Sequence, residues 1–283
     1  MANRFVALLA VAALSLGSPA ALAWEQTLSS SGKPLRWETS CYHWSLNESG
    51  SADVPADELE ALLREAYCAW EAPACSYFGF VETERAAVDE QAFHPDKGNV
   101  NLLVFRDEPG SWPYSHSVEA LTSVHYDPAS GEILDVDIEL NGEHYDFAAL
   151  DEYPPETTLI DLRSVATHEI GHTLGLDHSA EPEAVMYPYD QAGDTSKRKL
   201  HQDDRDGLCA LYPSEENPEV CEEPHCGLDL DGTSEGCATL DAAAGCGCAA
   251  AGRGGSAGAS PLVVAFFLSL APGLAAARRG RDQ

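Results

Sequence analysis

The order of apolar and polar residues along the chain predicts both strands and helices. In the stretch 133–141, ILDVDIELN, the apolar residues Val136, Ile138 and Leu140 alternate with acidic ones. This is the period of a strand with one face in the core and one face in water. Similar patterns predict strands over LRWETSCYHWSLN (35–47), NLLVFRD (101–107) and LTSVHY (121–126), the last joined to 133–141 by the turn DPASGE.

Three segments have helical features instead. DELEALLREAYCAWEA (57–72) repeats apolar residues at helical spacing, which predicts one buried face. In TTLIDLRSVATHEIGHTLGLDHS (157–179), Asp161 is a candidate N-cap, and Gly175 can adopt the left-handed conformation that ends a helix. A last helix follows His201, with carboxylates in its first turn. The mixed order of elements predicts an α+β or α/β domain over residues 24–213.

Both ends of the chain differ from this domain. Residues 1–23 have Arg4, an apolar run and a small-residue Ala21-Leu22-Ala23 site, the pattern of a secretory signal peptide. Residues 214–245 are acidic and contain cysteines, which indicates a linker or a small disulfide-stapled unit. Residues 246–283 contain the apolar PLVVAFFLSLAPGLAAA followed by RRGR. That order favours a membrane or sorting segment over a buried core helix.

Composition narrows the set of functions. The chain has 283 residues and a formal net charge of -31, which argues against charge-driven binding to nucleic acid or to an anionic membrane. The acidity would suit cationic substrates or serve only solubility. The basic cluster SKRK (196–199) is either an attractor for acidic substrates or a solvated loop. The nine cysteines of an exported chain favour disulfides, and Cys68 with Cys75 is the candidate for a local bridge.

HEIGHTLGLDHS (168–179) is the segment with the clearest chemistry. His168 and His172 are four residues apart, so on a helix they project from the same face and can bind one ion. Gly175 lets the chain turn back, which brings His178 to the same point as a third ligand. Three imidazoles leave one zinc coordination position open, as a catalytic zinc requires.

Glu169 would flank this ion without binding it, because one helical step rotates it by about 100° from His168. It is therefore a candidate general base that takes a proton from water activated by zinc, for attack on a peptide carbonyl. The alternative is a solvated helix with coincidental histidines. It would require five residues in register by chance: His168, Glu169, His172, Gly175 and His178.

This segment resembles the metzincin metallopeptidase motif HExxHxxGxxH, and AVMYPYD supplies the methionine turn expected after it, with Met186. Ser179, Tyr187-Pro188 and LHQDDRDGLCALYP (200–213) make the chain most similar to the matrixins. The resemblance implies a twisted, mostly parallel sheet with an antiparallel edge strand, packed by helices, and a zinc cleft below that edge. It further implies that 133–141 is the edge strand, to which an extended substrate adds.

The same resemblance implies roles for residues after the motif and shows where the chain departs from the family. Met186 would form the floor beneath the zinc, and Pro188 and Tyr189 would help to wall the substrate pocket. The family's cysteine-containing inhibitory pro-segment has no counterpart in the sequence, which leaves open how activity would be kept latent.

Further metal sites are a separate question. The family's structural zinc is bound by spaced histidines and an aspartate, and His116, His125 and His144 do not match that spacing, so we expect no second zinc. Calcium is a possible further cofactor on the acidic residues of 133–141, although a solvated face is the alternative. Those residues are Asp135, Asp137 and Glu139.

The C-terminal segment resembles a MYXO-CTERM sorting signal, made of a cysteine motif, an apolar helix and an arginine cluster. That likeness implies export, processing near Cys246 or Cys248 and attachment to the cell surface, with transient membrane association. We therefore expect a monomeric, exported zinc endopeptidase that acts on proteins or peptides. The alternatives are a surface binding or adhesion module with a vestigial metal site, against which the intact Glu169 argues, and hydrolysis of a non-peptide amide.

Overall fold

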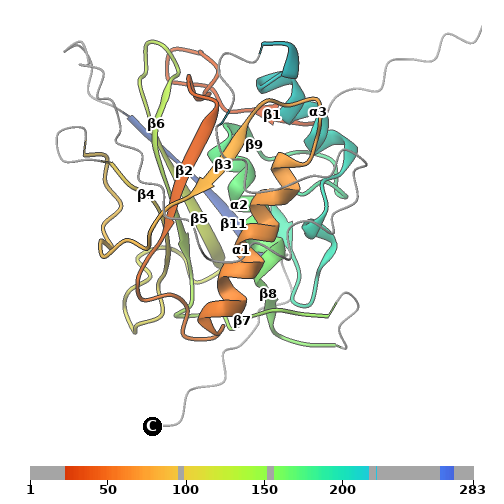
Figure 1. Ribbon diagram of the computed structural model, residues 1–283. Coiled ribbons are helices and arrows are strands. Elements are labelled where there is room, and N and C mark those ends of the chain that lie inside the picture. Colours follow the sequence, from red (N-terminus) through yellow and green to blue (C-terminus); the bar gives the residue numbers. More distant parts are fainter. Residues whose placement is uncertain (1–22, 95–98, 152–155, 217–220, 222–261, 271–283) are drawn as a thin grey trace, which may run out of the picture.

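A seven-stranded mixed sheet organises the part of the chain that the computed structural model describes, namely residues 23–94, 99–151, 156–216, 221 and 262–270 (Figure 1). The strand order is β10-β11-β5-β6-β4-β2-β3. Strands β3, β2, β4 and β6 are mutually parallel, and β5 is antiparallel to β6. The bounds are β2 Cys41–Leu46, β3 Gly79–Glu82, β4 Asn101–Phe105, β5 Val118–Tyr126, β6 Ile133–Leu140, β10 Tyr189–Asp190 and β11 Leu262–Leu270.

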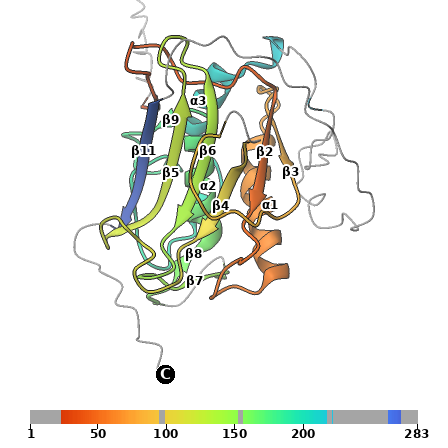
Figure 2. The same cartoon turned by 90° about the vertical axis from the view of Figure 1, so that its left-hand side faces the viewer.

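The described residues form three α-helices, and the first two of them contact strands on one face of this sheet, where Figure 2 shows them. They are α1 (Ala56–Glu71), α2 (Leu162–Thr173) and α3 (Gln202–Leu211). The indole Nε1 of Trp70 in α1 donates a hydrogen bond of 2.7 Å to the carbonyl of Thr167 in α2, which fixes the two helices together. The predicted α+β class and all three predicted helices are confirmed.

Short elements complete the described structure. Two small sheets pair β1 with β9 and β7 with β8. The bounds are β1 Glu25–Gln26, β7 Phe147–Ala148, β8 Ile160–Asp161, β9 Leu176–Asp177, and the 3-10 turns η1 Ser196–Arg198 and η2 Ser214–Glu216.

The antiparallel strand next to the site helix is β5, so the prediction that 133–141 forms the edge strand is wrong. Strand β6 lies inside the sheet, between β5 and β4. Its acidic face is not solvated either, since Asp135, Asp137 and Glu139 are all buried. Residues from covering loops reach that face: Asn99 donates to Asp135, and Arg106 pairs with Glu139. Alternation therefore distinguished the apolar face from the acidic face correctly, but it did not show that the acidic face is covered as well.

The disulfides join segments that are distant in the sequence. Cys41 pairs with Cys221 and Cys75 with Cys209, so the predicted local bridge between Cys68 and Cys75 is wrong. The reason is tertiary: the segment that carries Cys75 packs against the end of α3, where the amide of Ser214 donates to the carbonyl of Cys75 at 2.8 Å. The α-carbons of Cys75 and Cys209 are 5.4 Å apart.

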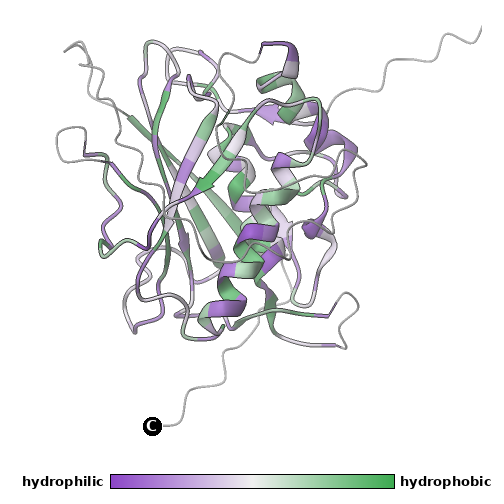
Figure 3. Cartoon of the chain, viewed as in Figure 1, coloured by the Kyte–Doolittle hydropathy of each residue, from purple (hydrophilic) through white to green (hydrophobic). Residues whose placement is uncertain are grey.

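The C-terminal apolar segment is a strand over Leu262–Leu270, where the resemblance to a sorting signal implied an apolar helix. Its valines and phenylalanines favour extended structure, and it pairs antiparallel with β5. Figure 3 shows this strand as mainly hydrophobic. Within the described ranges, no helix is both long enough and apolar enough to cross a membrane. The predicted signal peptide up to residue 22 and most of the predicted linker and sorting segment lie outside the described residues.

Candidate metal centre

At both ends of helix α2, side chains form hydrogen bonds with its backbone. The carboxylate of Asp161 accepts a hydrogen bond of 2.9 Å from the amide of Ser164, which makes it the N-cap that the sequence predicted. At the other end, the indole of Trp37 donates to the carbonyl of Thr173 at 2.8 Å. Carbonyl groups left over at a helix end need such donors when they are buried.

Gly175 turns the chain back after α2. Its φ of 89° lies in the left-handed region, and a Cβ there would collide with the backbone carbonyl of Leu35. The chain then runs through β9, which pairs with β1 and leads directly into His178. Glycine is therefore required both by the conformation and by the close approach of another segment.

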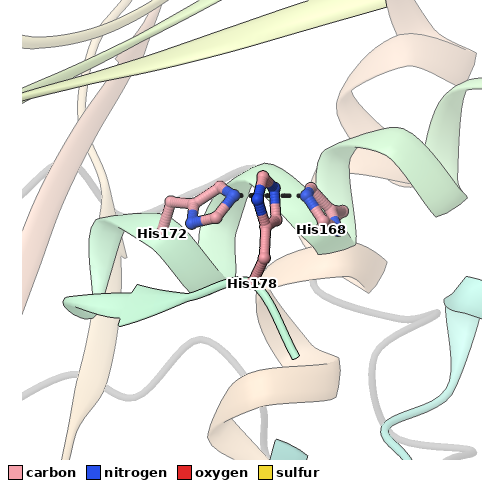
Figure 4. Close-up of side chains that lie close together, drawn as sticks. All are labelled: His168, His172 and His178. Atoms are coloured by element: carbon pink, nitrogen blue, oxygen red, sulfur yellow. Dashed lines mark hydrogen bonds between the residues drawn. The ribbon is translucent and has the colours of Figure 1, made fainter. Parts of the chain in front are cut away.

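Three histidines converge at this turn (Figure 4). His168 and His172 project from α2, and one ring nitrogen of each lies within 4.8 Å of one on His178. The Nε2 atoms of His168 and His172 are 3.2 Å apart. The structure thus brings together the three residues that the sequence singled out.

The hydrogen bonds of two rings fix which nitrogen faces the common point. Nδ1 of His168 lies 2.6 Å from the carbonyl of Val185, and Nδ1 of His172 lies 2.8 Å from the carbonyl of Leu176. Carbonyls only accept, so each Nδ1 carries the proton and each Nε2 presents a lone pair. Two lone pairs this close repel unless a cation lies between them. This arrangement fits a metal ion.

The ring of His178 and the burial of the three histidines also fit a metal ion. Nε2 of His178 is buried and finds no hydrogen-bond partner among the described residues. Burial lowers the pKa of His168, His172 and His178, which keeps the imidazoles neutral, as metal ligands must be. The donor set of three neutral imidazoles suits zinc.

Glu169 is fully buried beside the histidines. Its Oε2 accepts a hydrogen bond from the hydroxyl of Thr122 on β5, while Oε1 has no partner within the described part of the chain. Burial raises the pKa of Glu169 to about 8. One carboxylate oxygen is thus held, and the other is available.

Met186 packs against Gly171 of α2, the helix that carries His168 and His172, and its position depends on residues that the sequence analysis did not single out. A Cβ added at Gly171 would collide with the sulfur of Met186 and would lie 2.7 Å from Trp70, so only glycine allows this close packing. The carboxylate of Asp204 accepts the amides of Val185 at 2.8 Å and Met186 at 3.0 Å. The acidic first turn of α3 was noted in the sequence as a helix feature, and this second role was missed.

Asp203 ties two more segments to α3. Its Oδ2 accepts the hydroxyl of Ser179 at 2.6 Å, one residue after His178. Its Oδ1 lies 3.0 Å from the backbone nitrogen of Trp24, the first residue after the predicted signal peptide. The two aspartates at the start of α3 therefore support both the methionine turn and the third histidine.

The segment after Met186 leads into strand β10. Pro188 is half-buried, and Tyr189, on β10, is exposed. The interpretation of SKRK as a solvated basic loop is wrong for two of its residues. Lys197 is buried and donates to the carbonyl of Tyr187 at 2.6 Å, and Arg198 donates to Asp161 at 2.8 Å.

A second group of candidate ligands lies on the opposite face of the sheet and consists of His125, Asp135 and Asp137. We call it the outer cluster, and His168, His172 and His178 the inner cluster. Nδ1 of His125 is 3.2 Å from Asp135, and Oδ2 of Asp137 has no hydrogen-bond partner among described residues. Burial and the neighbouring Asp135 raise the pKa of Asp137 to about 8.

The other histidines and Glu139 do not belong to the outer cluster. The rings of His116 and His144 stack on each other with centroids 3.9 Å apart. Glu139 pairs with Arg106 and accepts the hydroxyl of Tyr114 at 3.1 Å.

A histidine pair on a helix, a third histidine beyond a left-handed glycine and a methionine turn packed against that helix define a metallopeptidase-type centre of the metzincin class. The family model Peptidase_M10, Matrixin, matches residues 36–213. The chain therefore belongs to the matrixin family, whose members use zinc.

Individual relatives are similar over this region. Matrix metalloproteinase-25 of Mus musculus is 29% identical over 188 residues, which cover 62% of this chain and 27% of that protein. Metalloendoproteinase 1-MMP of Arabidopsis thaliana is 30% identical over 183 residues, 64% of this chain and 45% of that protein. Neutrophil collagenase of Homo sapiens is 28% identical over 161 residues, 57% and 30% respectively. The chain thus spans less than half the length of each of these relatives.

Proposed function

We propose that the chain is an exported zinc-dependent endopeptidase that cleaves proteins or peptides as a monomer. The observation that carries this proposal is the inner cluster, in which the Nε2 atoms of two buried histidines are 3.2 Å apart with their Nδ1 atoms bonded to carbonyls. His168, His172 and His178 would bind the zinc. Membership of the matrixin family supports the same function.

Glu169 would be the general base. Zinc, when bound, supplies a Lewis acid that activates water and stabilises negative charge on the substrate carbonyl. Oε1 of Glu169, which has no partner among the described residues, would take the proton from the attacking water and pass it to the leaving amine. The hydroxyl of Thr122 would hold the other oxygen in place. Met186 would support the ligands from below, and Pro188 and Tyr189 would line the substrate pocket.

A peptide-library experiment tests this mechanism. The chain is loaded with zinc, its metal content is measured by mass spectrometry, and cleavage products are identified in a mixed peptide library. The Glu169→Gln variant should keep its zinc but lose roughly 100- to 10,000-fold in cleavage rate, because the base is lost while the ligands remain. Equal and measurable cleavage by the two proteins would contradict the role of Glu169. No cleavage by the zinc-bound chain, even after residues 262–270 have been displaced from β5, would favour the binding-module alternative.

We also propose that residues 1–23 direct export, that 24–213 form the peptidase domain, that 214–245 are a linker and that 246–283 are a sorting segment for surface attachment. The nitrogen of Trp24 lies 3.0 Å from Asp203, so signal cleavage before Trp24 would leave an α-ammonium group next to a carboxylate. N-terminal sequencing of the exported protein tests this boundary. A start well after Trp24 would contradict it.

The outer cluster is our candidate for a second cation, calcium or zinc, which departs from the expectation of no second zinc that was based on histidine spacing. Asp135 and Asp137 are buried; Oδ2 of Asp137 lacks a hydrogen-bond partner in the described structure, and Oδ2 of Asp135 faces Nδ1 of His125 at 3.2 Å. Two adjacent buried carboxylates need a proton or a cation. The nitrogen of His125 favours zinc over calcium, which prefers oxygen ligands only. Metal analysis of the His172→Ala variant, whose inner cluster is broken, would show which ion remains.

A further inference from the structure

Strand β11 lies in the cleft where, under the function proposed above, a substrate would bind. It pairs antiparallel with β5 from Leu262 opposite Tyr126 to Ser269 opposite Val118. On its other side it is parallel to β10, with Tyr189 opposite Ser269. An extended peptide that adds to the edge of β5 would make these same backbone hydrogen bonds. Figure 2 shows β11 along the side of β5 that faces away from β6.

The side chains of β11 also fill the site. Phe266 and Leu268 are buried and belong to the main core, while Phe267, on the opposite face, is 40% exposed. The ring of Phe266 stacks on the ring of His172, with centroids 4.2 Å apart and planes inclined by 9°. A candidate metal ligand is thus covered by a residue of the C-terminal segment.

The register places this cover over the candidate base as well. Phe266 is opposite Thr122, and Thr122 donates its hydroxyl to Glu169. A substrate carbonyl that approached both Glu169 and the histidines would have to occupy space that β11 now takes. From this geometry we infer that residues 262–270 are a built-in inhibitory strand that occupies the substrate cleft of the full chain.

This inference rests on the proposed function and adds its regulation. The inhibitory strand is part of the same chain, so its effective concentration at β5 exceeds that of a free peptide substrate. Activity should therefore appear only when the strand is displaced or cut away. Processing near Cys246 or Cys248, proposed above for sorting, would remove the strand and switch on the peptidase in one step.

The test compares full chains that differ only in β11. Phe266→Asp/Leu268→Asp places charge on the buried face, and Val263→Asp/Phe267→Asp places the same charge on exposed positions as the control. Cleavage of a quenched-fluorescent random peptide mixture and hydrogen exchange of the β5 amides are measured for both variants and the parent chain. The first variant should cleave at least about tenfold faster than the other two, because the open fraction of the cleft limits the apparent affinity. Its β5 amides should also exchange faster.

A second format avoids substitutions in the strand. A recognition sequence for a site-specific protease is inserted between residues 250 and 258, and the folded chain is cut, diluted and assayed before and after. A rise in cleavage after the cut, reversed by a synthetic peptide of residues 261–271, supports the inference.

The remaining outcomes are distinguishable. Equal and measurable cleavage rates, together with equal β5 exchange in all chains, would overturn the inhibitory strand and leave the peptidase intact. Self-cleavage within 262–270 would also overturn it, because the segment would then be a substrate. Faster β5 exchange without peptide cleavage by any zinc-bound form would support the occupied cleft but overturn the proposed function.

Discussion

The inner and outer clusters make an instructive comparison, because each consists of two buried candidate ligands and one half-buried candidate ligand, on opposite faces of one sheet. The inner cluster comes from one helix and the turn after it, so its spacing is visible in the sequence. The outer cluster comes from two antiparallel strands and is covered by loops, and the ring of Phe93 stacks near His125 with centroids 6.2 Å apart. A site whose ligands lie close together in the sequence can be predicted from the sequence. A site whose ligands come from different strands and are buried by loops can be recognised only once the fold is known.

The largest expected effect separates the two clusters by function. His172→Ala should lose the tightly bound zinc and lower cleavage by more than about 100-fold, since even changes to residues that only orient a ligand cost 10- to 100-fold. His125→Ala should keep both the zinc of the inner cluster and the rate of peptide cleavage. Metal content and peptide cleavage, measured on chains with the cleft opened, are the readouts. A comparable loss of activity in His125→Ala would break the comparison.

The next effect concerns the support of the inner cluster. Asp204→Ala leaves three backbone amides without their acceptor: the buried amides of Val185 and Met186 and the partly buried amide of His201. We expect the free energy of unfolding to fall by about 3 kcal/mol or more, measured by urea denaturation. Asp204→Asn keeps one acceptor oxygen and should lose about half as much. Equal losses would indicate that charge, and not hydrogen bonding to the methionine turn, is what matters.

A smaller effect should follow from adding a side chain where Gly171 packs against Met186 and Trp70. Gly171→Ala forces a methyl group against Met186 and Trp70, which we expect to cost about 1–3 kcal/mol of stability. In a double-mutant cycle, Met186→Ala should recover part of that loss by making space. Strict additivity of the two changes would contradict the contact.

The smallest expected effect belongs to the outer cluster. Calcium or zinc at ten times its dissociation constant should stabilise the chain by about 1.4 kcal/mol, seen as a rise in melting temperature. In Asp137→Asn that rise should vanish, while peptide cleavage is unchanged. A rise of equal size in the variant would show that the cation binds elsewhere.

Much of the inner architecture could be predicted because local rules determine it. The period of 57–72 predicted α1, Asp161 was recognised as the cap of α2, and the left-handed Gly175 was expected at its end. The metal-binding motif lies within these elements, so its convergence followed from helix geometry. The packing of Gly171 against Met186 depends on the methionine turn that follows the helix, and no spacing rule reveals it.

The wrong predictions share a cause. Each concerned a feature that is determined by contacts between segments distant in the sequence. Cys75 forms a disulfide with Cys209 on α3, and Asp135 is buried by a loop that carries Asn99. Likewise, the apolar run around Phe266 suggested a helix when considered alone, whereas next to the unpaired side of β5 it forms a strand. Local pattern cannot decide between those outcomes, because a short apolar run suits either.

The pairing of β11 with β5 also bears on the solubility of the chain. An uncovered strand at the edge of a sheet presents free amide and carbonyl groups, and another copy of the chain can add to it. While β11 is in place, the side of β5 that faces away from β6 is satisfied within the molecule. Loss of Leu262–Leu270 exposes that side, so a processed chain without a bound peptide has a greater tendency to self-associate through β5 than the unprocessed one.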